Sequence, residues 1–300
     1  MRQQKESRRF GARAAVLLLG LTAAAVVVPA SPASAAVPGL VRVTTTSATN
    51  SNDFHTTTAT CPAGKVLTGT GYELNGATGE AVVDDLRPNG GPAVAPTAVT
   101  VTAYEADAYA GSWSVTAYAI CANPVAGLVR VSATSVNNSN DFRSITAACP
   151  AGKVLTGTGY ELNGVTGEAV VDDFRPNGGA AAAPTSVNVG AYEADVTGLN
   201  WDATAFAICA NPLPGLVRIS ALSASNSADF RGITATCPVG KVLTGAGYEV
   251  DGATGEAVVD DFRPNGGAAT APTSDTAGAY EEDAFAGNWF ATSYAVCATA

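Results

Sequence analysis

The chain has 300 residues, of which 47% are hydrophobic and only 14% are charged, and its 26 acids against 16 bases give a formal charge of −10. Charged residues normally make up about a quarter of a globular protein, and a low-charge surface of Thr, Ser, Asn and Gly suits exposed β-sheet better than helix. The acidic balance argues against nucleic acid and anionic lipid as partners, because phosphate binding needs concentrated Lys and Arg.

Residues 1–36 have the three parts of a secretory signal: a basic segment up to Arg13, the apolar run Ala14 to Val28, and an A-x-A cleavage motif at Ala33-Ser34-Ala35. The apolar run is shorter than the roughly 20 residues that a spanning helix needs. We therefore expect export with cleavage near Ala35, an extracellular location, and no membrane insertion of the mature chain. Ser7-Arg8-Arg9-Phe10 partly matches a twin-arginine signal, which leaves the Sec and twin-arginine routes both open.

The leader holds one acid and five bases, so the mature chain has 25 acids against 11 bases, a charge of −14. This mature part is a tandem repeat with a period of 88 residues and no insertion in any copy. We predict a signal peptide at 1–36 and three modules at 37–124, 125–212 and 213–300. The short connections between them predict that neighbouring modules touch, in either a row or a closed ring.

Each copy shows the period-two alternation and the Asn-Gly and Pro-Asn-Gly-Gly turn signals of β-strands. In the first copy, strands are expected at Leu40 to Val43, Thr56 to Thr60, Val66 to Leu74, Glu80 to Leu86, Val99 to Tyr104 and Trp113 to Cys121. The sequence thus predicts an all-β protein of three tandem antiparallel β-sandwich or barrel modules. The glycines after Val66 are expected to let strands approach closely or bulge. Val99 becomes Asp275 in the third copy, which predicts an exposed strand start there.

Six cysteines allow 15 pairings, but the repeat period selects one bridge per copy. The predicted bridges are Cys61–Cys121, Cys149–Cys209 and Cys237–Cys297. Each closes a loop of about 60 residues, worth about 4 kcal/mol in the chain-entropy model. The chain has a single histidine, His55, and no CxxC motif, so disulfides in an oxidising compartment are favoured over metal or redox thiols.

Acidic residues recur at the end of the fourth expected strand and after the fifth. The simpler interpretation is an ion pair between Asp85 and Arg87, which share a strand face. The alternative is a calcium site, because hard cations take six to eight oxygen ligands. Its candidate ligands are Asp84, Asp85, Glu105, Asp107, Asp172, Asp173, Glu193, Asp195, Asp260, Asp261, Glu281 and Asp283. Calcium is the only cofactor considered.

Aromatic residues recur near the last two strands of each copy, where they serve either as core residues or as exposed platforms for sugar rings. The candidates for ligand binding are Trp113, Trp201, Trp289, Tyr104, Tyr192 and Tyr280. No catalytic residue is predicted. His55 is replaced by Arg143 and Arg231, which limits a histidine-dependent triad to one copy, and paired carboxylates for glycoside hydrolysis would need a cleft that such small modules do not suggest.

The run CPAGK-x-L-x-G-x-GYE, followed by GE-x-VVDD-x-RPNG, AYE-x-D and AYAICA, resembles a family of small secreted modules from extracellular proteins of high-GC actinobacteria. The resemblance covers all three copies. It implies secretion and a β-rich fold, and it carries no catalytic residue to this chain.

We expect a secreted, non-enzymatic protein that binds a cell-surface, glycan or protein ligand through multivalent weak contacts. The alternatives are a structural or coat-like extracellular repeat protein and, third, a secreted hydrolase or protease inhibitor. The ligand and the oligomeric state stay open.

Overall fold

The computed structural model describes residues 37–179, 182–267 and 270–300, and these contain eighteen β-strands and no helix. The all-β prediction is therefore confirmed. The predicted leader and its cleavage site lie outside the described residues. In the part of the chain that the structure describes, no helix is long and apolar enough to span a membrane.

Each copy contributes six strands, close to the positions expected from its alternating pattern. The first copy forms β1 (Val41–Thr46), β2 (Phe54–Thr60), β3 (Val66–Asn75), β4 (Ala81–Pro88), β5 (Ala98–Glu105) and β6 (Ser114–Ala122). The second forms β7 (Val129–Thr134), β8 (Phe142–Ala148), β9 (Val154–Asn163), β10 (Ala169–Pro176), β11 (Ser186–Glu193) and β12 (Asp202–Ala210). The third forms β13 (Val217–Leu222), β14 (Phe230–Thr236), β15 (Lys241–Asp251), β16 (Ala257–Pro264), β17 (Ser274–Glu281) and β18 (Phe290–Thr299).

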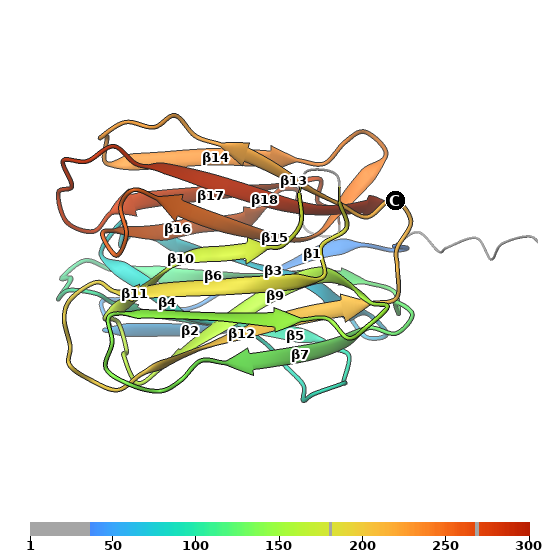
Figure 1. Ribbon diagram of the computed structural model, residues 1–300, viewed down its shortest axis with the longest axis horizontal. Helices are drawn as coiled ribbons and strands as arrows, with labels where there is room; N and C mark the ends of the chain where they lie inside the picture. The colour runs from blue at the N-terminus through green and yellow to red at the C-terminus, as the bar shows by residue number, and fades with distance from the viewer. Residues whose placement is uncertain (1–36, 180–181, 268–269) are drawn as a thin grey trace, which may run out of the picture. The chain divides into compact units, whose positions relative to one another are not determined.

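Every sheet is shared by two copies (Figure 1). The first copy places β1-β6-β3 beside β16-β17-β14 of the third copy, and its β2-β5-β4 beside β9-β12-β7 of the second. The third sheet joins β13-β18-β15 of the third copy to β10-β11-β8 of the second. All described pairs are antiparallel. The three copies therefore close on one another in a ring with pseudo-threefold symmetry, which answers the question that the sequence left open.

The disulfides link the two half-sheets within each copy. Cys61 follows β2 and bonds to Cys121 on β6, and the two other bridges are Cys149–Cys209 and Cys237–Cys297. All three predicted pairings are confirmed. Because the half-sheets of one copy belong to different sheets, each bridge also ties two of the three shared sheets together.

Strands β3, β9 and β15 meet about the pseudo-threefold axis. A Cβ on Gly157 would fall on the carbonyl oxygen of Thr68 in the preceding copy. In the same way, a Cβ on Gly245 would fall on the Thr156 carbonyl and one on Gly69 on the Thr244 carbonyl. The register of β3 against β6 shifts between Leu67 and Gly69. The expectation of close approach and bulging at these glycines is confirmed, because only a residue without a side chain lets the three backbones come this near.

Polar groups at the axis bond from one copy to the next. The hydroxyl of Thr70 donates to the carbonyl of Thr158 at 2.7 Å, and the hydroxyl of Thr158 donates to the carbonyl of Ala246 at 2.7 Å. The third copy has alanine in this position and cannot return the bond. The buried Tyr72, Tyr160 and Tyr248 connect through their hydroxyls, at 3.2 Å and 3.4 Å.

One large apolar core runs through all three copies, as expected for modules that touch. Its most unusual member is Asp275, which has no exposed surface. The prediction of an exposed strand start at this position is wrong. Ser293 of β18, at the position of Ala117 in the first copy, faces Asp275 from the other sheet. Its hydroxyl donates to the Asp275 backbone carbonyl at 3.0 Å and to its carboxylate at 3.4 Å. Burial raises the pKa of Asp275 well above its ordinary value.

Candidate functional site

The three candidate tryptophans are core residues. Trp113, Trp201 and Trp289 have no exposed surface, and the indole N–H of Trp113 donates to the Glu105 carboxylate at 3.0 Å and to the Asn52 carbonyl at 3.1 Å. The interpretation as sugar platforms is therefore wrong for the tryptophans, because neither ring face reaches solvent. His55 packs edge-on against Trp113 with ring centroids 4.3 Å apart, where the other copies place Arg143 and Arg231 over the indole.

The predicted calcium ligands do not converge. Asp84 is buried and accepts the backbone N–H of Gly167 in the next copy at 3.3 Å, Glu105 holds the indole of Trp113, and Asp107 is exposed. The equivalents in the other copies repeat this dispersal. Among the described residues no group of three or more acids, histidines or cysteines could hold a metal ion. The calcium alternative is corrected accordingly, because each of these acids is held in different surroundings: Asp84 in the buried joint, Glu105 at the indole and Asp107 at the surface.

The arginine after the acidic pair bonds to a different carboxylate from the one predicted. Burial raises the pKa of Asp85, and the Thr102 hydroxyl and then Arg87, which shares a strand face with it, offset part of that rise. The ion pair of Arg87 is with Glu161 of the second copy, at 2.9 Å. Arg263 pairs with Glu73 at 2.7 Å, and Arg175 pairs with Glu249. The recurring Arg therefore joins copies, a role that one copy's sequence cannot reveal.

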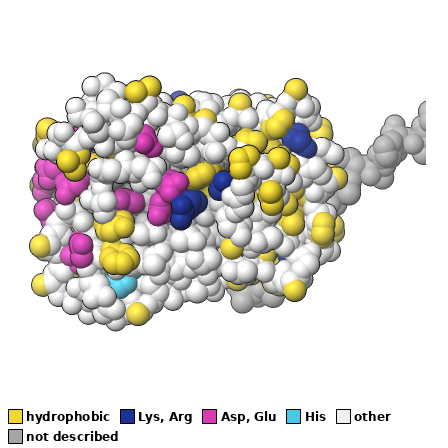
Figure 2. Space-filling model, turned by 90° about the horizontal axis from the view of Figure 1, so that it is seen from below, with side chains coloured by type: hydrophobic (Ala, Val, Ile, Leu, Met, Phe, Trp, Pro, Cys, Tyr) yellow, Lys and Arg dark blue, Asp and Glu magenta, His cyan; other side chains and the backbone are white. Residues whose placement is uncertain are grey.

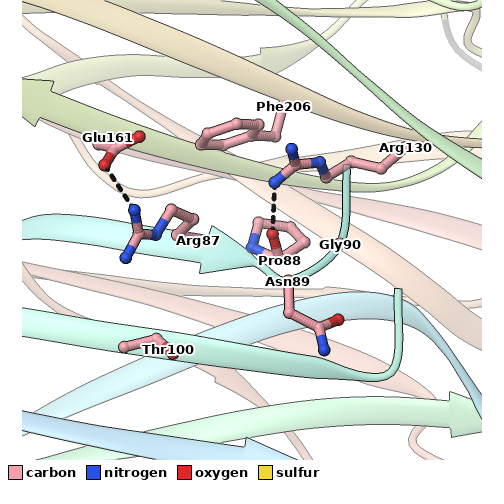
Figure 3. Close-up of a pocket in the computed structure, with 8 residues that line it drawn as sticks. All are labelled: Arg87, Pro88, Asn89, Gly90, Thr100, Arg130, Glu161 and Phe206. Atoms are coloured by element: carbon pink, nitrogen blue, oxygen red, sulfur yellow. Dashed lines mark hydrogen bonds and ion pairs between the residues drawn. The ribbon is translucent and has the colours of Figure 1, made fainter. Parts of the chain in front are cut away.

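A pocket of about 340 Å³ opens beside this ion pair, at the joint between the first and second copies (Figure 3). Arg87 borders it from β4 and Arg130 from β7. The Arg130 guanidinium lies over the Phe206 ring, 4.7 Å from its centroid, and donates to the Pro88 carbonyl at 2.7 Å. Thr100 of β5 forms a further part of the lining.

The Pro-Asn-Gly turn builds one wall of the pocket. The Asn89 side chain accepts the backbone N–H groups of Thr97 and Ala98, at 2.7 and 3.0 Å, and so closes its own loop. Gly90 supplies a φ of 85°, in the region that favours glycine. The loop then pairs with the first strand of the next copy, where the N–H of Arg130 donates to the Val94 carbonyl at 3.1 Å. The RPNG motif thus fixes the two arginines of neighbouring copies around one opening.

The same arrangement recurs at the other two joints. A pocket of about 380 Å³ lies between the third and first copies, lined by Arg42, Tyr118, Arg263, Pro264, Asn265, Gly266 and Thr276. At the remaining joint Arg218 lies over Tyr294 at 4.7 Å and donates to the Pro176 carbonyl at 2.8 Å. Six of the eleven basic residues of the described chain therefore lie in pairs, one pair at each of the three joints.

These arginines keep donors available for a ligand. The ion pair with Glu161 is formed by one terminal nitrogen of Arg87, whose side chain is 47% exposed. Burial, and then the neighbouring charge of Arg87, lower the pKa of Arg130. In the face that Figure 2 presents, acidic side chains gather toward one end, while basic ones lie near the middle, beside an acid, and toward the opposite end. Each pocket is thus a local concentration of guanidinium groups on an acidic protein.

The three joints differ in one group. Tyr118 and Tyr294 donate their hydroxyls to Glu73 and Glu249, the carboxylates that pair with the arginines. Phe206 has no hydroxyl, so Glu161 receives no such bond. Asp173 lies opposite Glu249 across the joint. Burial and then the Glu249 carboxylate raise the pKa of Asp173 to about 6.

The candidate tyrosines are half-buried, and each stacks on an exposed phenylalanine that the sequence interpretation missed. Phe54 lies over Tyr104 with ring centroids 5.6 Å apart, and Phe142 over Tyr192 and Phe230 over Tyr280 at 4.5 Å. These phenylalanines recur with the repeat period, one residue before His55, Arg143 and Arg231. That recurrence in the sequence could have marked them as candidates.

Comparison with known proteins adds little. No protein-family model matches the chain, and no curated protein does. The major capsid protein P2 of bacteriophage PM2 shares 9% identity with it, over 56% of this chain and 97% of that one, with a TM-score of 0.23. A protein of an archaeal virus, described by its triple jelly roll fold and turret assembly, shares 9% identity over 86% and 91% of the two chains, with a TM-score of 0.19.

Proposed function

We propose that the protein is a secreted, non-enzymatic binding protein that attaches to an extracellular surface through its three arginine pockets. The observation that carries this proposal is the threefold placement of two arginines from neighbouring copies at one joint, which border an open pocket at the joints of the first and second and of the third and first copies. A guanidinium group presents N–H donors in a planar fork that matches a carboxylate, sulfate or phosphate. Each pocket would therefore take a single anionic group of the ligand. The three disulfides fit an oxidising compartment outside the cell.

The overall charge narrows the kind of ligand. A mature chain of −14 repels dense polyanions, whereas an isolated anionic group meets two guanidinium groups at a pocket. Three equivalent arginine pairs on one closed ring raise the overall affinity for a surface that repeats such groups, because the second and third contacts become intramolecular. Weak individual sites are then sufficient.

Titration with glucuronate, followed by NMR shifts of the Gly90, Gly178 and Gly266 amides, tests the proposal. Saturable shifts are expected in the wild type, and glucose, which lacks the carboxylate, should give none. A triple variant, Arg87→Gln with Arg175→Gln and Arg263→Gln, should lose the response. The matched control removes the same number of positive charges at the half-buried lysines, which lie outside the pocket lining (Lys65→Gln, Lys153→Gln, Lys241→Gln), and should retain it. Equal loss in both variants, or no saturable shift in the wild type, would contradict the proposal.

The number of pockets gives a graded second readout. On a surface that carries glucuronate groups, dissociation should become faster with each Arg→Gln substitution in turn. Sedimentation of the wild type without ligand separates this function from a coat-like role, since assembly into large particles would favour the latter.

A further inference from the structure

Each sheet carries its aromatic pair and its arginine pocket on the same outer face. Thr100 and Tyr104 of β5 point away from the core, while the alternate residues Val99, Val101 and Ala103 are buried in it. Thr100 lines the pocket, and Tyr104 stacks on Phe54 of the adjacent β2. Four residues of strand separate the two, about 13 Å. The other sheets repeat this spacing, from Thr276 to Tyr280 and from Asn188 to Tyr192.

The phenylalanines keep much of their surface in water. Phe54, Phe142 and Phe230 are 49%, 40% and 43% exposed, although each rests on a tyrosine. In the third copy the Phe230 ring lies so close over Gly232 and Gly278 that a Cβ on either would approach it to within 2.7 and 3.3 Å. Small neighbours thus let the ring lie against the sheet, where apolar area stays open to a ligand.

The surface between pocket and aromatic pair is polar and shallow. Thr56 and Thr102 hydroxyls lie 3.2 Å apart, and those of Thr58 and Thr100 lie 2.9 Å apart. In the second copy Asn188 bonds to Ser144 and Thr146 in the same positions. In the first two copies these hydroxyl and amide groups offer donors and acceptors to a ligand lying along β5 or β11. The third copy has Gly232 and Gly278 in place of Thr56 and Thr102 and keeps the Thr234–Thr276 pair, 2.7 Å apart.

We infer that each sheet face is one extended site for an acidic oligosaccharide, whose carboxylate enters the arginine pocket and whose next sugars reach the Phe–Tyr pair. This inference rests on the proposed function and extends the same site. A pyranose ring combines an apolar C–H face, which suits an aromatic side chain, with hydroxyls that suit the Thr and Asn row. The length of the face excludes a monosaccharide as the full ligand. The protein's negative charge favours a chain in which acidic sugars alternate with neutral ones.

Binding of two probes distinguishes the pocket from the extended site. Glucuronate alone fills the pocket, and a tetrasaccharide of alternating glucuronate and N-acetylglucosamine reaches the aromatic pair. By calorimetric or NMR titration, the wild type should bind the tetrasaccharide about tenfold more tightly than glucuronate, an increment of the size expected for aromatic contacts. The triple variant Phe54→Ala with Phe142→Ala and Phe230→Ala should lose that increment and keep its affinity for glucuronate. Val239→Ala, which gives an exposed turn position the residue of the other copies, is the control and should behave as wild type.

The outcomes separate the two proposals. If glucuronate binds in the wild type but the tetrasaccharide is no tighter, or if the phenylalanine variant keeps the increment, the extended site is wrong and the arginine pocket stands. If neither probe binds, both fail. An acidic peptide such as tetraglutamate that binds as tightly as the tetrasaccharide, with equal sensitivity to the phenylalanine variant, would overturn the assignment to a glycan. Circular dichroism and melting of each variant establish that it is folded.

Discussion

The joints between copies have an inner part at the axis and an outer part at the surface, and the two differ in packing, charge and exposure. At the axis, three backbones touch through glycine and buried tyrosine, with no charge and no room. A few residues outward along β9, this strand meets β4 of the first copy through the Arg87–Glu161 ion pair beside an open pocket. Leu86 faces Tyr160 on the inside of the joint, and its neighbour Asp85 faces Glu161 on the outside. One pair of strands thus holds the ring together on one face and forms the site on the other.

The largest effect is expected at the axis. Gly157→Ala would place a methyl group on the Thr68 carbonyl, where backbone rather than a flexible side chain must move. We expect a loss of about 3 kcal/mol or more in the free energy of unfolding, as for severe overpacking. Urea denaturation measures it. Gly91→Ala, at a position with open space around it, is the control and should be near neutral. A loss at Gly157 below 1 kcal/mol would show that the axis is loosely packed.

The next effect depends on pH and concerns Asp84, Asp172 and Asp260, which lie between axis and rim. Burial raises the pKa of each well above its ordinary value, opposed by one backbone N–H. The folded state then holds protons that the unfolded state has released, so this stabilisation is complete below about pH 4 and is lost as pH rises through the folded-state pKa. Burial and then nearby acids raise the pKa of Glu282 to about 7. Glu282 therefore also contributes stability that is lost as the pH rises.

The melting temperature should therefore fall from pH 5 to pH 8. Replacing the three aspartates by asparagine keeps an oxygen for the glycine N–H and removes the titration, so the variant should be more stable at pH 8 and depend less on pH. The control changes the exposed Asp53, Asp141 and Asp229 to asparagine. A wild type that melts higher at pH 8 than at pH 5 would contradict this prediction.

A smaller gain is expected from completing the threonine ring. Ala246→Thr should let the third copy donate to the Thr70 carbonyl, as Thr70 and Thr158 do to theirs. A neutral hydrogen bond contributes about 1 kcal/mol net, which equilibrium unfolding resolves. Thr158→Ala should cost a similar amount. Destabilisation by Ala246→Thr would mean that the third copy has no room for the methyl and hydroxyl groups.

The smallest effect on stability is expected at the rim. Arg87→Ala removes an exposed ion pair, which contributes less than about 1 kcal/mol. A double-mutant cycle with Glu161→Ala isolates the pair. A coupling above 2 kcal/mol would assign this arginine a structural role and weaken the case that its position serves a ligand.

The sequence predicted what each copy does alone and missed what copies do together. Alternation in Val66 to Leu74 was sufficient for the strand, and the repeat period was sufficient for the disulfides. The partner of Arg87 could not be predicted, because Glu161 lies 74 residues away in another copy and an equivalent Glu73 stands in the first. The burial of Asp275 could not be predicted for a similar reason, because its hydrogen-bond partner Ser293 lies on the facing sheet.

The shared sheets also limit how this gene can evolve. Nearly identical tandem repeats recombine unequally and gain or lose copies, and repeat proteins stacked in a row tolerate such changes. Here each copy leaves one half-sheet to be completed by the copy before it and the other by the copy after it. A chain with two copies would leave two half-sheets without partners, and one with four would have to part the strands that meet at Gly69, Gly157 and Gly245. Copy number is thus fixed at three by closure, while the sequence within each copy stays free to diverge.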